Sequence, residues 1–252
     1  MIKPSFCDVF CTFAGRMKKI GIIVAMDKEF TQLRTLLDEA QTERHNHKDF
    51  VIGEMQGTQV ILQQCGIGKV NSAIGAVEMI DQYHPDLVIS TGVAGGASIE
   101  LNPLDVVVAT ECVYHDAYCG DEVEYGQIMG LPARFKAPKE LVEKALSLNN
   151  SFNTQHSTFN IHSGLTVSGE WFVNSKEKML SILKHFPEAM AVDMESCSIA
   201  QTCHIYKTPF ISFRIISDVP LKDNKAAQYF DFWNRMAEGS FEVTKEFLKA
   251  LL

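Results

Sequence analysis

The chain has 252 residues, 46% of them hydrophobic and 21% charged, and its formal net charge is −8. This is the make-up of an ordinary soluble globular protein, and the lack of linkers, repeats and low-complexity runs favours a single domain. The acidic balance argues against a nucleic-acid or anionic-membrane surface, and no apolar stretch is long enough to span a bilayer.

The cysteines and histidines do not have the spacing of a metal site. The seven cysteines are scattered along the chain, and the eight histidines form no H-E-x-x-H motif. Reduced, buried thiols in a cytoplasmic protein are the simplest interpretation of this pattern. We therefore predict no metal and no cofactor.

The amino-terminal residues predict an extension followed by a strand and a helix. Residues 1–16 fit no element and lack the apolar core and cleavage site of a signal peptide. We expect them to be disordered or to precede the natural start, and we place the domain at 17–252. Lys19–Ala25 is an apolar run typical of a buried strand, and a helix with 3.6-residue apolar periodicity opens at Met26.

Glu29 lies in the first turn of that predicted helix and has two interpretations. An acidic residue there is favoured by the helix dipole, which is a purely structural reason for its presence. Alternatively, its carboxylate faces a crevice where the preceding strand ends. Position alone favours the first interpretation.

The next segment predicts paired strands, a tight turn and a helix. Phe50–Met55 and Gln59–Gln63 resemble a strand pair, and we expect His45-Asn46-His47 to be a solvated loop. The turn C-G-I-G-K-V at 65–70 lacks the third glycine of a dinucleotide fingerprint and the Ser or Thr of a P-loop, so we predict a strand-to-helix turn there.

The middle of the chain alternates strands with glycine-rich and aromatic loops. Leu87–Ser90 predicts a buried strand that enters T-G-V-A-G-G-A at 91–97, where the glycines permit either positive φ or close approach to a ligand. A strand follows at Leu104–Ala109. The long loop from Tyr114 to Phe135 is typical of binding loops.

The second half continues the alternation and ends two strands in polar groups. Helices are predicted at 138–148, 177–183, 196–206 and in an amphipathic carboxyl-terminal segment, and strands at 159–168, 190–193 and 211–219. Asp193 and Glu195 follow one strand, and Ser217-Asp218 close another that contains Arg214. Asp218 alone could be a helix cap, but a second strand with the same ending favours a ligand crevice at this sheet edge.

The alternating elements predict an α/β protein, a single-domain three-layer α/β/α sandwich around a central sheet. The residues by themselves indicate an acidic, aromatic, glycine-lined crevice. Trp171 and Phe172 follow a strand and would either join the core or stack on a flat heterocycle.

Five motifs occur in a characteristic order: I-G-I-I-V-A-M-D-K-E at 20–29, S-T-G-V-A-G-G at 90–96, V-S-G-E-W-F-V at 167–173, V-D-M-E at 192–195 and F-R-I-I-S-D at 213–218. The set resembles the 5'-methylthioadenosine/S-adenosylhomocysteine nucleosidases of the purine nucleoside phosphorylase superfamily. The resemblance runs from about Met17 to the carboxyl terminus. It implies a nucleoside phosphorylase-like mixed sheet, a homodimer, and hydrolysis of the bond between adenine N9 and ribose.

The resemblance also implies catalytic roles. Asp218, aided by Ser217, would protonate adenine at N7, and Glu29 would be the base that activates water. Arg214 would help to position that water.

Substrate-binding roles are implied in the same way. Glu195 would accept from both ribose hydroxyls, because an ionised carboxylate only accepts. Met194 would pack on the sugar, Phe172 would stack on adenine, and the backbone of Val173 would read its Watson–Crick edge. The remaining predicted contacts are Val93 and Gly95 in the glycine-rich turn, and Met26, Ile67 and Phe230 as an apolar sleeve for the 5' substituent, although these three could equally be core residues.

Three departures from the family pattern concern the substrate range. Val93 stands where the family usually has Ser, and Asp193 stands where it usually has Glu. The loop Tyr118–Val123 diverges from the segment that crosses between subunits in the family.

Three alternatives remain open at this stage. They are a phosphorolytic transferase on the same fold, a hydrolase of aminodeoxyfutalosine or 5'-deoxyadenosine, and a non-catalytic nucleoside-binding module. Phosphorolysis is disfavoured because phosphate sites normally use arginines, whereas the first loop offers Asp27, Lys28 and Glu29.

Overall fold

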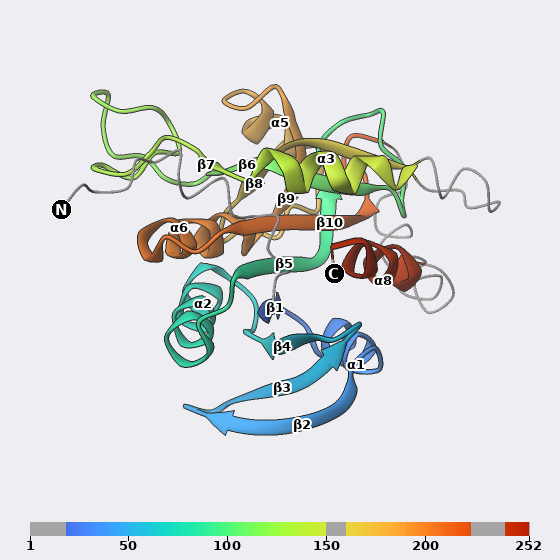
Figure 1. Cartoon of the computed structure of the whole chain (residues 1–252). Helices are drawn as coiled ribbons and strands as arrows, with labels where there is room; N and C mark the ends of the chain where they lie inside the picture. Colours follow the sequence, from blue (N-terminus) through green and yellow to red (C-terminus); the bar gives the residue numbers. More distant parts are fainter. Residues whose placement is uncertain (1–18, 150–159, 223–239, 252) are drawn as a thin grey trace.

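The computed structural model describes residues 19–149, 160–222 and 240–251 (Figure 1). The predicted extension at 1–16 and the predicted contact Phe230 lie outside these ranges. The strands are β1 Lys19–Val24, β2 Asp38–His45, β3 Lys48–Met55, β4 Thr58–Gln64, β5 Leu87–Gly96, β6 Val106–Tyr114, β7 Phe135–Lys136, β8 Ile161–Ser168, β9 Ala189–Asp193 and β10 Phe210–Asp218. The helices are α1 Asp27–Arg34, α2 Lys69–Tyr83, α3 Lys139–Ser147, α5 Lys176–Leu183, α6 Ser196–Tyr206 and α8 Ser240–Leu251.

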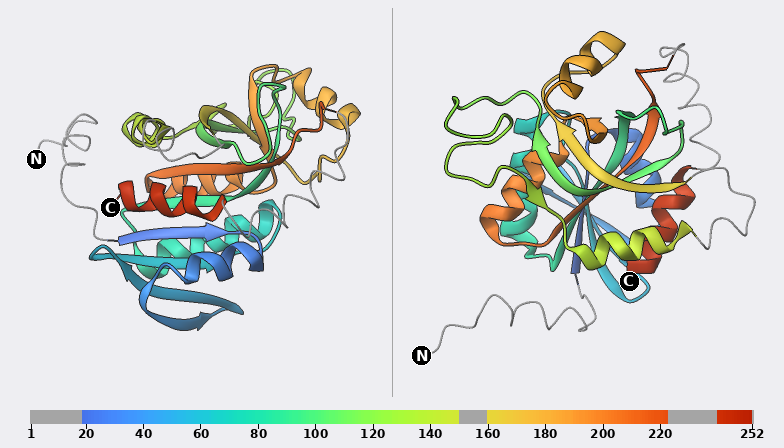
Figure 2. Two further views of the ribbon diagram at one scale, coloured as in Figure 1. Left: turned by 90° about the vertical axis from the view of Figure 1, so that its right-hand side faces the viewer. Right: turned by 90° about the horizontal axis from the view of Figure 1, so that it is seen from above.

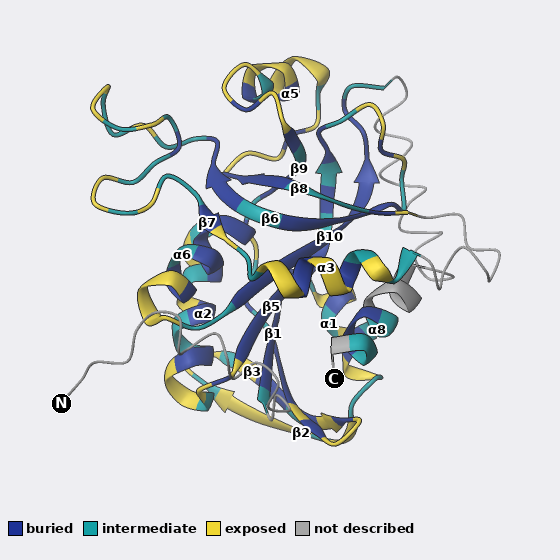
Figure 3. Ribbon diagram, turned by 45° about the horizontal axis from the view of Figure 1, so that its top comes forward, coloured by how far each residue is buried: buried dark blue, intermediate teal, exposed yellow. Residues whose placement is uncertain are grey.

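A mixed sheet separates two layers of helices, which confirms the predicted fold class. The strand order is β10-β6-β8-β9-β5-β1-β4-β3-β2, and β7 adds to β6. Helices α2 and α6 pack together on one face, whereas α1, α3 and α8 cover the other (Figures 1 and 2). Helix α5 stands beyond the end of β9 (Figure 3).

The central strands are buried on both faces because each supplies side chains to two cores. Along β1, Ile22 packs in the core beneath α1, α3 and α8, and the next residue, Ile23, packs in the core beneath α2 and α6. This alternation explains why β1 is a continuous apolar run, as expected of a parallel strand covered by helices on both sides. None of the helices in the described ranges is long and apolar enough to cross a membrane.

Strand pairing brings several carboxyl ends to one place. Strands β1, β5 and β10 are mutually parallel, with β5 in the middle. Strand β9 meets the end of β5 in antiparallel fashion, with Val192 opposite Gly95. Since β10 also pairs with β6, and β6 connects through β8 to β9, these strands and β5 close into a ring. The segments that follow β1, β9 and β10 therefore surround the last residues of β5.

Three elements differ from the sequence-based expectation, and the first is β6, which was predicted at Leu104–Ala109 and is found at Val106–Tyr114. Strand β5 continues through the glycine-rich run to Gly96, because β10 pairs with it as far as Asp218 opposite Gly95 and so satisfies its backbone groups. Strand β2 was not predicted; it is polar, largely exposed, and pairs only with β3 at the sheet edge. His45 ends that strand, whereas Asn46 and His47 form the predicted loop with positive φ.

Candidate active site

A pocket opens where β1, β5, β9 and β10 end, and its cavity volume is about 120 Å³. Its lining comprises Ala25, Met26, Glu29, Ile67, Val93, Ala94, Gly95, Trp171, Phe172, Val173, Val192, Asp193, Met194, Glu195, Arg214, Ser217 and Asp218. The structure thus brings together every predicted site residue within the described ranges.

Glu29 combines the two interpretations that its sequence position allows. It is the third residue of α1, and its Oε2 accepts a hydrogen bond from the Met26 backbone N–H at 3.0 Å, as in half of a capping box. Its Oε1 accepts from the Val93 N–H at 3.1 Å. Burial raises the pKa of Glu29, while Arg214 and the backbone N–H groups oppose that rise. A raised pKa makes this carboxylate a stronger base.

Gly92 allows this arrangement because its bare Cα faces the charged groups. A Cβ at this position would lie 2.6 Å from Arg214 Nη1 and 2.7 Å from Glu29 Oε1, and the φ of +150° also favours glycine. A glycine is therefore needed at position 92, where the backbone of β5 comes close to two side chains of the pocket. The sequence had left open either close approach to a ligand or positive φ in a turn; the close approach found at Gly92 is to two side chains, and Gly92 lies within a strand.

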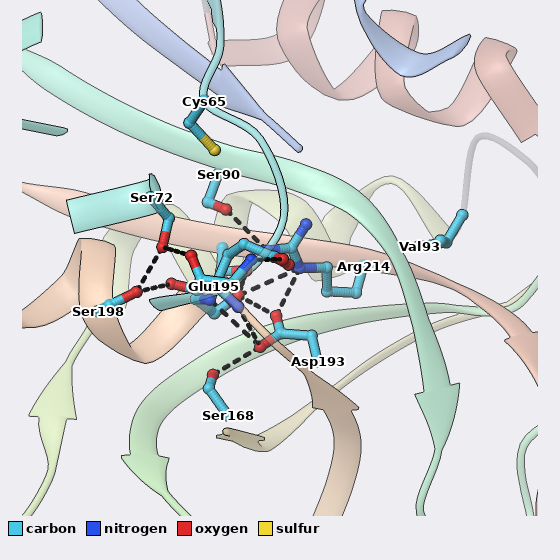
Figure 4. A network of polar contacts seen from close by, with 12 residues as sticks. Cys65, Ser72, Ser90, Val93, Ser168, Asp193, Glu195, Ser198 and Arg214 are labelled. Atoms are coloured by element: carbon cyan, nitrogen blue, oxygen red, sulfur yellow. Dashed lines mark hydrogen bonds and ion pairs between the residues drawn. The ribbon is translucent and has the colours of Figure 1, made fainter. Parts of the chain in front are cut away.

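Arg214 is only 1% exposed and lies within β10, every residue of which is buried. Its Nε donates to Asp193 Oδ2 at 2.7 Å and its Nη2 donates to Ser90 Oγ at 2.9 Å (Figure 4). Glu195 Oε2 lies 3.9 Å from the same Nη2. Burial would lower the pKa of Arg214, but Asp193, Glu195 and Glu29 raise it, so the guanidinium stays charged.

Asp193 holds Arg214 and is itself held by two serines. Its Oδ1 accepts from Ser168 Oγ at 2.6 Å (Figure 4). Its Oδ2 accepts from Ser196 Oγ. The backbone N–H of Ser196 also donates to Oδ1, at 3.2 Å. Sequence analysis did not include Asp193 among the site residues. The available signal was Arg214 itself, because a buried guanidinium needs a buried carboxylate partner.

Glu195 projects from the β9–α6 junction and accepts from the Gly68 N–H through Oε1 at 2.9 Å. Burial, which is the largest cause, raises the pKa of Glu195 to about 7, and the nearby carboxylates of Asp193 and Glu29 add to this rise. The Arg214 guanidinium and the Gly68 N–H oppose it. The carboxyl group therefore titrates near neutral pH. Gly68 was not predicted to contribute to the site, because its turn in the sequence indicated only a change of chain direction.

The motif resemblance assigns the ribose hydroxyls of an adenine nucleoside to Glu195, and a carboxyl group can accept from both hydroxyls only when it is ionised. On that assignment we expect KM to rise as pH falls through about 7. The contribution of Glu195 to folding stability depends on pH in the opposite direction: it is larger at low pH. The folded-state pKa lies above the ordinary value of 4.5, so the contribution of this group to folding is complete below 4.5 and is lost as pH rises through about 7. KM measured from about pH 6 to about pH 8 tests this, and a pH-independent KM would contradict it. Glu195→Gln should flatten the profile.

Ser217 and Asp218 end β10 as a hydrogen-bonded pair. Ser217 Oγ lies 2.7 Å from Asp218 Oδ1 and 3.2 Å from the carbonyl oxygen of Ala94. A hydroxyl has a single hydrogen, so it donates to only one of these oxygens at a time. When the Ser217 hydroxyl donates to the Ala94 carbonyl, its oxygen is free to accept a hydrogen bond from a protonated Asp218 carboxyl group.

The wall opposite the carboxylates is aromatic and apolar. Trp171 is 44% exposed and Phe172 is 57% exposed, whereas the adjacent Val173 is buried. The Trp171 ring lies 5.2 Å from the ring of the buried His115. Trp171 and Phe172 therefore stand at the pocket mouth instead of joining the core, in agreement with the heterocycle-stacking interpretation.

No three or more His, Cys, Asp or Glu side chains in the described ranges are arranged to hold a metal ion. Within the pocket lining, one guanidinium lies among the carboxyl groups of Asp193, Glu195 and Glu29, so acidic groups outnumber basic ones there. Exposed aromatic rings stand next to these groups.

The fold and this pocket define an α/β protein with a small-molecule site at one edge of its sheet. The sequence profile described as Phosphorylase superfamily matches residues 19–249, which is most of the chain. Sequence relatives narrow the assignment. The 5'-methylthioadenosine/S-adenosylhomocysteine nucleosidases of Desulfotalea psychrophila and Bacillus subtilis are 39% and 36% identical to the chain, over 92% of its length and 98% and 99% of theirs.

Solved structures agree with the sequence relatives. The nucleosidase of Neisseria meningitidis in complex with methylthio-immucillin-A superposes with a TM-score of 0.84 at 34% identity, covering 93% of this chain and 100% of that one. The nucleosidase of Colwellia psychrerythraea in complex with adenine gives a TM-score of 0.85 at 32% identity, covering 93% and 96%. The chain belongs to the 5'-methylthioadenosine/S-adenosylhomocysteine nucleosidase family, which confirms the resemblance found in its motifs.

Proposed function

We propose that the protein hydrolyses the N-glycosidic bond of 5'-methylthioadenosine and S-adenosylhomocysteine, releasing adenine and the 5'-thioribose product. One observation carries the choice of hydrolysis over phosphorolysis. Arg214 is surrounded by Asp193, Glu195 and Glu29, so the pocket offers no surplus positive charge to an incoming phosphate. The buried carboxylate of Glu29 would repel a phosphate and suits a water.

The proposed reaction uses two carboxyl groups for two proton transfers. Asp218 donates its proton to N7 of adenine, so that the electron pair of the breaking N9–C1' bond leaves on a neutral base. The oxygen of a water bonds to C1' of the oxocarbenium-like sugar, and Glu29 takes the proton of that water. Ser217 supports Asp218 through the 2.7 Å contact, and Arg214 lies close enough to Glu29 to help orient the water.

The other pocket residues bind the substrate in this proposal. Glu195 accepts from the two ribose hydroxyls, Phe172 stacks on adenine, and the backbone of Val173 reads the edge of the base. Met194 packs on the sugar, Met26 and Ile67 contact the 5' substituent, and Val93 and Gly95 border the ribose. All of these residues line the same pocket, which supports the assignment.

Val93 keeps one contribution to the site although it has no hydroxyl. Its backbone N–H donates to Glu29, a contact that any residue except proline can make at this position. The side chain itself adds an apolar surface to the lining where relatives usually place a hydroxyl. The substitution therefore bears on substrate preference, and leaves the proposed base and its N–H partner in place.

The test is release of adenine from each nucleoside, followed by chromatography with and without phosphate. Free adenine together with a reducing 5'-thioribose in phosphate-free buffer supports hydrolysis. Release that requires phosphate and yields a sugar 1-phosphate would move the protein to the transferases. Binding without release in either buffer would favour a silent module, or a substrate such as 5'-deoxyadenosine or aminodeoxyfutalosine.

We also propose a homodimer in the cytoplasm. Ile67, Val70 and Ile74 are 54%, 69% and 47% exposed and follow one another around the start of α2, next to the pocket mouth. A second copy of the chain would cover this apolar stripe and the pocket entrance together. The described cysteines are free thiols, as is usual in a reducing compartment.

Ile74→Lys is expected to shift the protein from dimer to monomer in analytical ultracentrifugation, because a charge would be buried in the apolar interface. Ile99→Lys is the matched control, since Ile99 is 67% exposed and lies between β5 and β6, outside α2. A wild-type monomer, or dissociation of both variants, would contradict the placement of the interface on α2.

A further inference from the structure

Three charged side chains outside the pocket lining form a closed set of hydrogen bonds. Lys69 Nζ donates to both carboxylate oxygens of Asp116, at 2.9 and 2.8 Å. The Glu170 backbone N–H donates to Asp116 Oδ2 at 2.8 Å, and Glu170 Oε1 accepts from the Lys69 N–H at 2.7 Å. We call Lys69, Asp116 and Glu170 the clamp. It joins the start of α2, the exit of β6 and the exit of β8.

The Lys69–Asp116 pair of the clamp is well shielded, whereas Glu170 is exposed. The Asp116 side chain is 9% exposed and that of Lys69 is 27% exposed. The Lys69 ammonium also stands 5.3 Å from the centre of the Tyr114 ring, within reach of a cation–π attraction. A bidentate ion pair in such surroundings is screened less by solvent than an exposed pair.

Each end of the clamp is one or two residues from the pocket. Lys69 follows Gly68, whose N–H holds the carboxylate of Glu195. Glu170 precedes Trp171 and Phe172, which form the aromatic wall. The clamp therefore fixes the distance between the proposed ribose acceptor and the proposed base-stacking ring.

Helix α2 explains why these contacts exist. It has no acidic residue in its first turn and no side-chain cap at Gly68, so its first N–H groups need acceptors from elsewhere. Glu195 accepts from Gly68, and Glu170, 101 residues away in sequence, accepts from Lys69. Two glutamates from separate loops thus complete one helix end, where negative charge is favoured by the helix dipole.

The fit around the clamp is tight on both sides. Gly68 has a φ of +96°, and a Cβ there would lie 2.7 Å from Glu170 Oε2. A Cβ on Gly169 would lie 2.4 Å from the ring of His115, which backs the loop. The loop at 169–172 therefore lies between α2 and His115, with the side chains of Glu170, Trp171 and Phe172 exposed.

We propose that Lys69, Asp116 and Glu170 are positioning residues for nucleoside binding: they hold Phe172 at a fixed place relative to Glu195. This inference rests on the proposed function, since it assigns the stacking of adenine to Phe172. Removing a contact of the clamp leaves the proposed proton-transfer groups Glu29 and Asp218 unchanged. It should therefore weaken the binding of the substrate and of the transition state by the same factor.

Glu170→Ala is expected to raise the KM for methylthioadenosine roughly tenfold while kcat stays within about twofold, the signature of lost uniform binding. Asp116→Asn is expected to act in the same direction. Glu170→Gln should recover most of the wild-type KM, because its amide oxygen can still accept from the Lys69 N–H. Lys178→Met is the matched control: it removes a longer contact to the Phe172 carbonyl, at 3.3 Å in an exposed setting, and should leave KM nearly unchanged.

A double-mutant cycle shows whether the clamp acts through the aromatic ring. Glu170→Ala should add no further loss once Phe172→Ala is present, since coupled residues are not additive. The proposal would be overturned if the KM increases of the two single variants multiplied in the double variant. It would also be overturned if Glu170→Ala lowered kcat and left KM unchanged. The dissociation constant of adenine, measured by calorimetry, provides a readout that needs no turnover. Unchanged adenine affinity in folded Glu170→Ala also overturns the clamp, whereas a wild-type protein that binds adenine but releases none contradicts the proposed function alone.

Discussion

Glu29→Gln is expected to lower kcat by roughly 10³-fold, within the usual range for removal of a general base, while the affinity for methylthioadenosine changes only a few-fold. The amide has nearly the same shape but cannot take a proton from water. It also has one oxygen for the two N–H donors of Met26 and Val93 that the carboxylate now serves. We therefore expect a modest loss of stability, on the order of 1–3 kcal/mol, next to the large loss of turnover.

Asp27→Asn is the matched control, because Asp27 lies in the same first turn of α1 but is exposed and outside the pocket lining. It should leave both kcat and affinity unchanged. Activity of Glu29→Gln within about tenfold of wild type would contradict the role of base and leave Glu29 as a helix cap. Loss of binding together with turnover would make it a binding residue.

The sequence predicts the strands that build the site because they carry strong local signals. Strand β10 is apolar throughout apart from its serines, Arg214 and the terminal Asp218, and β1 is a short apolar run, so periodicity suffices to find both. Parallel pairing then determines where their ends meet. The position of the pocket at that edge follows from topology.

The contacts that the sequence did not predict are those between segments far apart in the chain. The bond from Gly68 to Glu195 spans 127 residues, and the bond from Arg214 to Asp193 depends on the placement of β9 beside β5. The extension of β5 through its glycines also depends on β10 as a partner. Strand β2 lacks an apolar face altogether, so only its pairing with β3 defines it.

Asp193→Ala is expected to destabilise the fold by roughly 3–5 kcal/mol, because it leaves a buried guanidinium without its hydrogen-bonded partner. Asp193 is the carboxylate closest to Arg214, at 2.7 Å, whereas Glu195 lies 3.9 Å away and cannot replace that bond. The hydroxyls of Ser168 and Ser196 would lose their acceptor in the same step. Urea unfolding provides the measurement, with the slope compared between variants.

The matched control is Asp49→Ala, which removes the carboxylate of an Arg44 pair whose side chains are 66% and 49% exposed. That change should cost at most about 1 kcal/mol, since exposed ion pairs contribute little. Equal losses for the two variants would mean that Asp193 does not hold Arg214. Asp193→Asn separates charge from shape: it keeps an oxygen for the serines but places no charge opposite Arg214, so we expect an intermediate loss. Because Asp193 holds the Arg214 guanidinium in place before substrate binds, loss of this contact should affect folding and catalysis together. We therefore expect the free energy of unfolding and kcat to fall in parallel from wild type to Asp193→Asn to Asp193→Ala.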